Sequence, residues 1–186
     1  MLESGDADLT FMFPAPSNLN TALFPLTGGL PDRSKRLGTV GAVWVKRAES
    51  PLEWEGNAFV AHAKPIVGIR SQAFGLTEPI RAMGFTVMDT AIDSVQLLRM
   101  LQHGRFDVAA IFDVEAAQLL QRPEFSDLRV LKKQLDDRDI YAVVRRDLPQ
   151  ALMSDARSLW ENIARLRDQP EFRSPKAHVK GAGEIR

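Results

Sequence analysis

Short apolar runs alternate with amphipathic stretches along most of this chain. Residues 39–45 (TVGAVWV) form an unbroken β-rich run, and residues 106–112 (FDVAAIF) are apolar apart from Asp107; both have strand length and are typical of buried strands. Between Ser94 and Gly104 the apolar residues return every three or four positions, which predicts a helix with one buried face. The same reasoning predicts further strands at 9–13, 66–69, 85–88, 128–131 and 140–144, and further helices at 71–83, 114–121 and 149–167. Alternation of this kind favours an α/β fold, with a mostly parallel sheet and helices on both faces.

Capping residues and turn-forming residues predict where some helices and loops begin and end. We expect the regular part of the helix in 71–83 to begin at Thr77 as its N-cap and to close at Gly84. Residues 14–38 are rich in turn-forming residues, and we expect one short strand near 22–26. Residues 50–57 read as a linker.

Composition excludes several functions. Lysine plus arginine equals aspartate plus glutamate, 24 of each, so nothing favours a nucleic-acid partner. The absence of cysteine excludes disulfides and thiolate metal sites, and three scattered histidines favour no metal site of another kind. No run of about 18 apolar residues occurs, so no membrane span is expected. The first eight residues are acidic and do not form a signal peptide.

Four stretches carry a resemblance to a known family. They are residues 65–69 (PIVGI), 98–110 (LRMLQHGRFDVAA), 139–147 (DIYAVVRRD) and, at the start, 2–8 (LESGDAD). By the order and spacing of these stretches along the chain, the sequence resembles the type II periplasmic solute-binding proteins, and among them the amino-acid-binding (family 3) extracellular solute-binding proteins. That family has two α/β lobes, joined by two crossing strands, with the ligand between the lobes.

The resemblance implies one near-complete lobe, with a mostly parallel sheet, plus part of the second lobe. The implied parts are a remnant of lobe 1 (1–38), a first crossing strand (39–46), lobe 2 (47–139), a second crossing strand with a closing helix on lobe 1 (140–170), and a loose tail (171–186). Relative to the family the chain is expected to be N-terminally incomplete. The apolar surface so exposed predicts a homodimer through the incomplete lobe, a missing partner segment or poor stability.

The implied function is binding of a small polar ligand, an amino acid or a related compound, without chemistry and without a cofactor. The expected partners are that ligand and either a membrane transporter of the ABC type or a signalling protein. The expected location is the periplasm. Two alternatives stay open: an enzyme on the same two-lobe scaffold, and a ligand-sensing domain of a signalling protein.

The expected binding residues begin with the loop Arg70-Ser71-Gln72-Ala73. It follows a predicted strand and enters a helix, where backbone N–H groups and the helix dipole favour an anion. An ordinary helix entry with a solvated Arg70 is the alternative. The family usually has glycine followed by serine or threonine where this chain has Gln72 and Ala73. It also has an arginine in the stretch equivalent to 13–26, where this chain has none.

Two further residues are candidates at other places. Asp113 follows a buried strand at its carboxyl end, where ligands bind in open α/β sheets, and helix N-capping is the alternative. Trp44 lies on the first crossing strand as an apolar wall of the cleft or as a core residue. Glu115 reads as an ordinary charge in the first turn of a helix, and Asp107 as a residue that holds a turn.

Overall fold

The structure is a computed structural model that describes residue 2 and residues 4–14, 16–60 and 64–172. The chain divides into two compact units. Unit 1 comprises the described residues of Met1–Thr39 and Arg138–Pro175, and unit 2 those of Val40–Asp137. The tail predicted from residue 171 lies almost entirely outside the described residues. No helix in the described ranges is long and apolar enough to cross a membrane.

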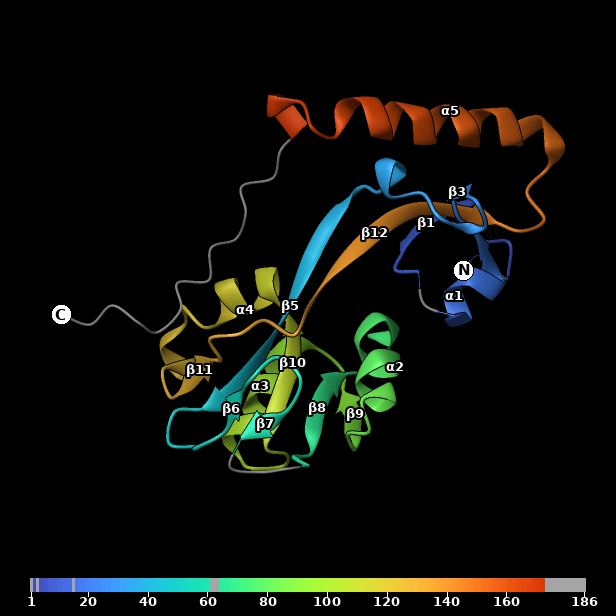
Figure 1. Cartoon of the computed structure of the whole chain (residues 1–186). Helices are drawn as coiled ribbons and strands as arrows, with labels where there is room; N and C mark the ends of the chain where they lie inside the picture. Colours follow the sequence, from blue (N-terminus) through green and yellow to red (C-terminus); the bar gives the residue numbers. More distant parts are fainter. Residues whose placement is uncertain (1, 3, 15, 61–63, 173–186) are drawn as a thin grey trace. The chain divides into compact units, whose positions relative to one another are not determined.

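Unit 2 is built around a parallel three-stranded core. Strand β8 (Val67–Arg70) pairs in parallel with β9 (Val87–Ala91) on one side and with β10 (Val108–Phe112) on the other. Strand β5 (Gly38–Arg47) pairs antiparallel with β10, and β11 (Leu128–Val130) pairs antiparallel with β5 (Figure 1). The strands that alternate with helices are therefore parallel, as the sequence pattern predicts.

Helices cover both faces of this sheet. On β10, Val108 and Ala110 join a core that contains Leu76 of helix α2 (Phe74–Ala82). Ala109 and Ile111 point the other way, into a core with α3 (Ser94–Gln102) and α4 (Asp113–Leu119). Because successive residues of a strand face opposite sides, an unbroken apolar run such as VAAIF is needed to bury both.

The predicted linker at 50–57 is partly a small hairpin, which the sequence analysis missed. Strand β6 (Glu53–Trp54) pairs with β7 (Phe59–Val60). Trp54 and Phe59 are buried and pack against Trp44, with ring centroids 5.5 and 5.0 Å from it. Burial of three aromatic side chains outweighs the turn-forming composition of this stretch.

The predicted start of the helix in 71–83 is wrong. Helix α2 begins at Phe74 with Ala73 as its N-cap, and Thr77 lies inside it. The buried Thr77 hydroxyl donates a hydrogen bond to the Ala73 carbonyl (3.2 Å), so its hydrogen-bonding need is met within the helix. Pro79 therefore lies in the second turn of α2. The predicted end is confirmed, because Gly84 follows the C-cap with φ +86°.

Unit 1 is a smaller antiparallel arrangement. Strand β12 (Asp136–Arg145) pairs with β1 (Leu9–Met12) and with β2 (Ala22–Leu23). Helix α5 (Gln150–Leu166) packs on β12, and its Trp160 donates an indole hydrogen bond to the Ala142 carbonyl (2.8 Å). The remaining elements are the short helix α1 (Pro16–Thr21), the hairpin of β3 (Leu26–Thr27) and β4 (Leu30–Pro31), and the 3-10 turns η1 (Arg33–Lys35), η2 (Pro123–Phe125) and η3 (Pro170–Phe172), of which η2 belongs to unit 2. The sequence predicted one strand where α1, β2, β3, β4 and η1 occur.

Strands β5 and β12 each contribute residues to both units. Within unit 1, the Thr39 hydroxyl donates to Asp139 (2.7 Å) where the two strands run side by side. Within unit 2, the Leu135 amide donates to the Ala42 carbonyl (2.9 Å) beside β5. Strand β5 thus has a neighbour in β12 within unit 1, and a neighbour in the residue just before β12 within unit 2. The assignment of these segments as crossing strands stays a prediction.

Candidate ligand pocket

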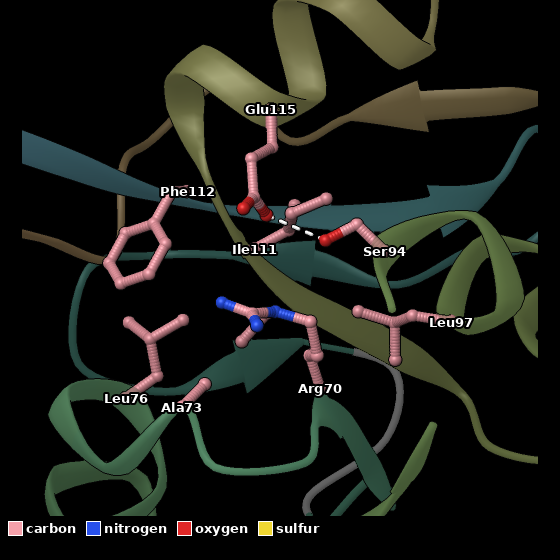
Figure 2. A pocket seen from close by; sticks show the side chains of 9 residues that line it. Arg70, Ala73, Leu76, Ser94, Leu97, Ile111, Phe112 and Glu115 are labelled. Carbon is pink, nitrogen blue, oxygen red and sulfur yellow. Dashed lines mark hydrogen bonds between the residues drawn. The ribbon is translucent and has the colours of Figure 1, made fainter. Parts of the chain in front are cut away.

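A narrow pocket opens at the carboxyl ends of the three parallel strands of unit 2 (Figure 2). From β8 the chain crosses to β9 on one side, and β10 then pairs on the other side of β8. The ends of β8 and β10 thus form the point where the strand order reverses. Open α/β sheets bind ligands at such points, because the loops leave in opposite directions and leave a crevice.

The pocket is small and belongs to unit 2 alone. Its empty space is about 190 Å³, including space open to solvent. Its lining consists of Arg70, Ala73, Leu76, Ser94, Leu97, Ala110, Ile111, Phe112 and Glu115. Three of these side chains are polar, and two of the three carry opposite charges.

Arg70 is the cation of the pocket. It is the last residue of β8, and Figure 2 shows its guanidinium extending toward the middle of the pocket, near Phe112 and Glu115. Within the part of the chain that the structure describes, the guanidinium makes no hydrogen bond or ion pair. A half-buried guanidinium has five N–H donors in a planar fork suited to a carboxylate. Arg70 is therefore free to bind an anion that enters the pocket.

Glu115 is the anion of the pocket. It lies in the first turn of α4, and one of its oxygens (Oε2) accepts a hydrogen bond from the Ser94 hydroxyl (2.6 Å). Ser94 is held in place by the N-cap of α3, where Asp93 accepts from the Gln96 amide (2.7 Å). One carboxylate oxygen is thus fixed, and the carboxylate keeps acceptor capacity for a donor in the pocket.

The entry to α2 adds hydrogen-bond donors beside Arg70. The N-cap Ala73 has no side chain that can accept a hydrogen bond, so no side chain caps the first turn of α2. Uncapped first-turn N–H groups carry partial positive charge. Gln72, just before, has φ +62°, a conformation that favours glycine.

Of the six residues expected to bind ligand, Arg70 and Ala73 line the pocket. The Ser71 amide is used by the sheet, donating to the Ala91 carbonyl (2.7 Å), and Gln72 is exposed. Asp113 is the first residue of α4, with its carboxylate accepting from the Val114 amide (2.7 Å). It is neither among the lining residues nor the N-cap, which is Phe112.

Trp44 is placed in the core rather than in the pocket. Its side chain is fully buried among Trp54, Phe59 and Phe85, so it has no surface to offer a ligand. The core role was the stated alternative for this residue. Asp107 also has a structural role, because its carboxylate accepts from the Ile66 amide (2.7 Å) at the entry to β8.

Sequence reasoning missed Ser94, Phe112 and Glu115 as pocket residues. Ser94 and Glu115 are far apart in sequence, and each follows a different strand of the sheet. Their common position just after strands β9 and β10 was the available signal, since parallel strands end at one edge.

This arrangement defines the fold class. Solved structures that match the chain with TM-scores of 0.61 to 0.66 are periplasmic amino-acid-binding proteins and sensor domains. The chain has the type II periplasmic-binding-protein fold, as its sequence resemblance predicts. No protein-family model matches the sequence, and no curated protein matches it.

Three of these structures illustrate the likeness. Holo ArgBP from T. maritima is 16% identical, with a TM-score of 0.65 over 92% of this chain and 69% of that one. A histidine kinase sensor domain with similarity to periplasmic binding proteins is 16% identical, with a TM-score of 0.66 over 92% and 68%. The periplasmic VFT2 domain of Bordetella pertussis BvgS is 17% identical, with a TM-score of 0.61 over 92% and 66%. The chain thus spans about two thirds of the length of these proteins.

Proposed function

We propose that this protein binds a small zwitterion, an amino acid or a close relative, in the pocket at the carboxyl edge of β8, β9 and β10. The ligand carboxylate binds Arg70 and the uncapped first turn of α2. The ligand ammonium group binds Glu115. The role is capture of a solute or sensing of it, and no chemical step is part of the proposal.

The observation that carries the proposal is the pair of opposite charges that share one pocket without bonding each other. Arg70 and Glu115 both line it, and no ion pair joins them. A half-buried charge without a partner of opposite charge is costly, and two opposite charges that line one pocket would ordinarily pair. A ligand that carries both charges satisfies each of them, and this explains why they are kept apart.

The direct test is calorimetric titration with the standard amino acids, followed by charge-deleted analogues of the tightest one. The amine that lacks the carboxylate and the acid that lacks the ammonium group each lose one charge-assisted contact. Each contact contributes about 1.5 to 3 kcal/mol, so each analogue is expected to bind about ten- to a hundredfold more weakly. Equal binding of all three compounds would contradict the assignment.

Two variants test the residues themselves. Arg70→Gln is expected to weaken binding of the amino acid about ten- to a hundredfold while leaving binding of the amine analogue unchanged. Glu115→Gln is expected to do the converse. Arg105→Gln and Glu124→Gln are the matched controls, because both residues are exposed and lie outside the pocket. Loss of binding in the controls would point to a general electrostatic effect instead.

The choice between transport and sensing concerns the partner. ArgBP is named as a binding protein, and another neighbour is a substrate-binding protein of an amino acid ABC transporter. The kinase and BvgS neighbours are sensory domains. All four kinds of neighbour are consistent with a periplasmic or extracellular location and a partner in the membrane, which we propose for this protein too. The neighbours are binding and sensor proteins, which favours a role without catalysis over the enzyme alternative.

The homodimer expected from the sequence stays a prediction. Phe11 on β1 of unit 1 is 59% exposed and provides the place to test it. Sedimentation equilibrium of the natural protein and of Phe11→Lys should show a dimer weakened by the substitution. A monomer at all concentrations would remove this prediction.

A further inference from the structure

We infer that the ligand is an amino acid with a small apolar side chain, such as valine or leucine, and that Phe112, Leu76 and Leu97 select it. This inference rests on the proposed function. It concerns the part of the pocket that Arg70 and Glu115 do not use.

The first argument is the inventory of lining groups. Arg70, Glu115 and Ser94 are the polar side chains of the pocket, and Ser94 already donates its hydroxyl hydrogen to Glu115. The other six lining residues are apolar: Ala73, Leu76, Leu97, Ala110, Ile111 and Phe112. Once the ligand's two charges are paired, Ser94 is the remaining polar side chain of the lining, and its hydroxyl oxygen can still only accept a hydrogen bond. A polar or charged ligand side chain would therefore lose most of its water with little compensation.

The second argument is rigidity of the apolar wall. Leu76 and Leu97 are buried, at 1% exposed each, and belong to the two cores on either face of the sheet. Phe112 packs against the same core as Leu76, and Figure 2 shows its ring at the side of the pocket opposite Leu97. Side chains anchored in close-packed cores keep their positions, so this wall of the pocket stays apolar when a ligand enters.

The third argument is size. The empty space of about 190 Å³ includes space open to solvent, so the enclosed part of the pocket is smaller still. A short side chain is therefore favoured over a long one.

The test compares ligands of matched shape on the unmodified protein. Affinities for glycine, alanine, valine and leucine are measured by titration calorimetry and are expected to rise about fourfold per added methylene until the space is filled. Valine is compared with threonine, and leucine with asparagine, since each pair is similar in shape but differs in polarity. The apolar member is expected to bind at least tenfold more tightly.

The outcomes separate this inference from the proposed function. Equal or tighter binding of threonine, asparagine, glutamate or arginine would overturn the apolar specificity and leave the zwitterion site standing. No binding by any amino acid would overturn both.

A variant tests the wall directly. Phe112→Asn is expected to reduce the valine-to-threonine affinity ratio by at least threefold, while Phe11→Asn, at an exposed phenylalanine outside the pocket, leaves the ratio unchanged. Near-ultraviolet circular dichroism of both variants without ligand checks their folding. If Phe112→Asn does not fold, the ligand series on the unmodified protein decides.

Discussion

Gly68 on β8 illustrates how tightly unit 2 is packed at the scale of a single residue. A Cβ atom added at Gly68 would lie 2.2 Å from the ring of Phe106, far inside the van der Waals distance. Phe106 is 2% exposed and cannot move outward without opening the core on its face of the sheet. This position therefore requires glycine for packing and not for its backbone conformation.

Gly68→Ala is expected to lower the free energy of unfolding by about 1 to 3 kcal/mol, because the added methyl group overpacks the core. Chemical denaturation measures the change. Gly38→Ala, also in a strand but with open space around it, is the control and should change stability by less than about 0.5 kcal/mol. If Phe106→Leu rescues part of the loss in the double variant, the clash is confirmed; strictly additive losses would contradict it.

Tyr141 is the only tyrosine of the chain and lies buried on β12. Burial raises the pKa of its phenol above the ordinary value of 10.0, and the nearby Asp139 carboxylate raises it further. The unfolded chain therefore loses this proton at lower pH than the folded protein does. The stability linked to Tyr141 is complete below pH 10 and is lost as the pH rises through the folded pKa.

Tyrosinate absorbance is expected to show a higher titration midpoint in the folded protein than in denaturant. Because a single tyrosine is present, the signal needs no deconvolution. Tyr141→Phe should reduce the fall in unfolding free energy above pH 10. Equal midpoints in the folded and denatured states would contradict the buried environment.

At the scale of elements, α3 depends on a reciprocal pair of caps at its start. Asp93 accepts from the Gln96 amide, and the Gln96 side chain accepts from the Ile92 amide, each at 2.7 Å. These bonds satisfy two donors that a helix start otherwise leaves free. They also fix Ser94, which bonds Glu115 in the pocket.

Asp93→Ala is expected to lower the unfolding free energy by about 1 kcal/mol, the usual effect of removing an N-cap. Ligand affinity should fall as well, since Ser94 loses its fixed position. Asp155→Ala, on the exposed side of α5, is the matched control and should lower neither quantity. A loss of stability without any change of affinity would show that the cap does not support the pocket.

The sequence predicted those elements whose signals are local. The helix between Ser94 and Gly104, the helix end at Gly84 and the strand within 106–112 all depend on residues a few positions apart, and the structure has α3 at Ser94–Gln102, a helix end at Gly84 and β10 at Val108–Phe112. The hairpin of β6 and β7 could not be predicted in this way. It forms because Trp54 and Phe59 pack on Trp44 across a long loop, a contact that no local pattern reports.

The candidate site was predictable in part for the same reason. Arg70 and Ala73 adjoin the end of a predicted strand, so the local reading reached them. Glu115 was interpreted as an ordinary first-turn charge. Its place in the pocket depends on the contact with Ser94, and the parallel order of β9, β8 and β10 brings these two residues together. Strand order is a property of the whole sheet, and the sequence of one chain does not state it.

At the scale of the whole molecule, the two units share their longest strands. Residues of β5 and of β12 belong to both, so neither unit has a complete set of strands without them. Loss of order in either strand removes pairing partners from both units. We therefore expect one cooperative unfolding transition.

Differential scanning calorimetry is expected to show a single peak. Saturating amino acid, at a hundred times its dissociation constant, stabilises the folded state by about 2.7 kcal/mol, which corresponds to a rise in Tm of about 5 to 10 °C for a chain of this size. The whole peak should move. Two peaks, of which the ligand moves one, would show that the units unfold independently.

The three tryptophans make the protein its own optical reporter. Trp44 and Trp54 are buried, edge to face, beside a core that includes the pocket residues Ala73 and Leu76, and their indole N–H groups have no acceptor among the described residues. Trp160 lies in unit 1 and donates to a backbone carbonyl. The fluorescence emission of Trp44 and Trp54 should be blue-shifted, and its intensity should change when a ligand binds beside Ala73 and Leu76. The emission of Trp160 should stay constant. A Trp160→Phe protein would thus report occupancy without any added dye.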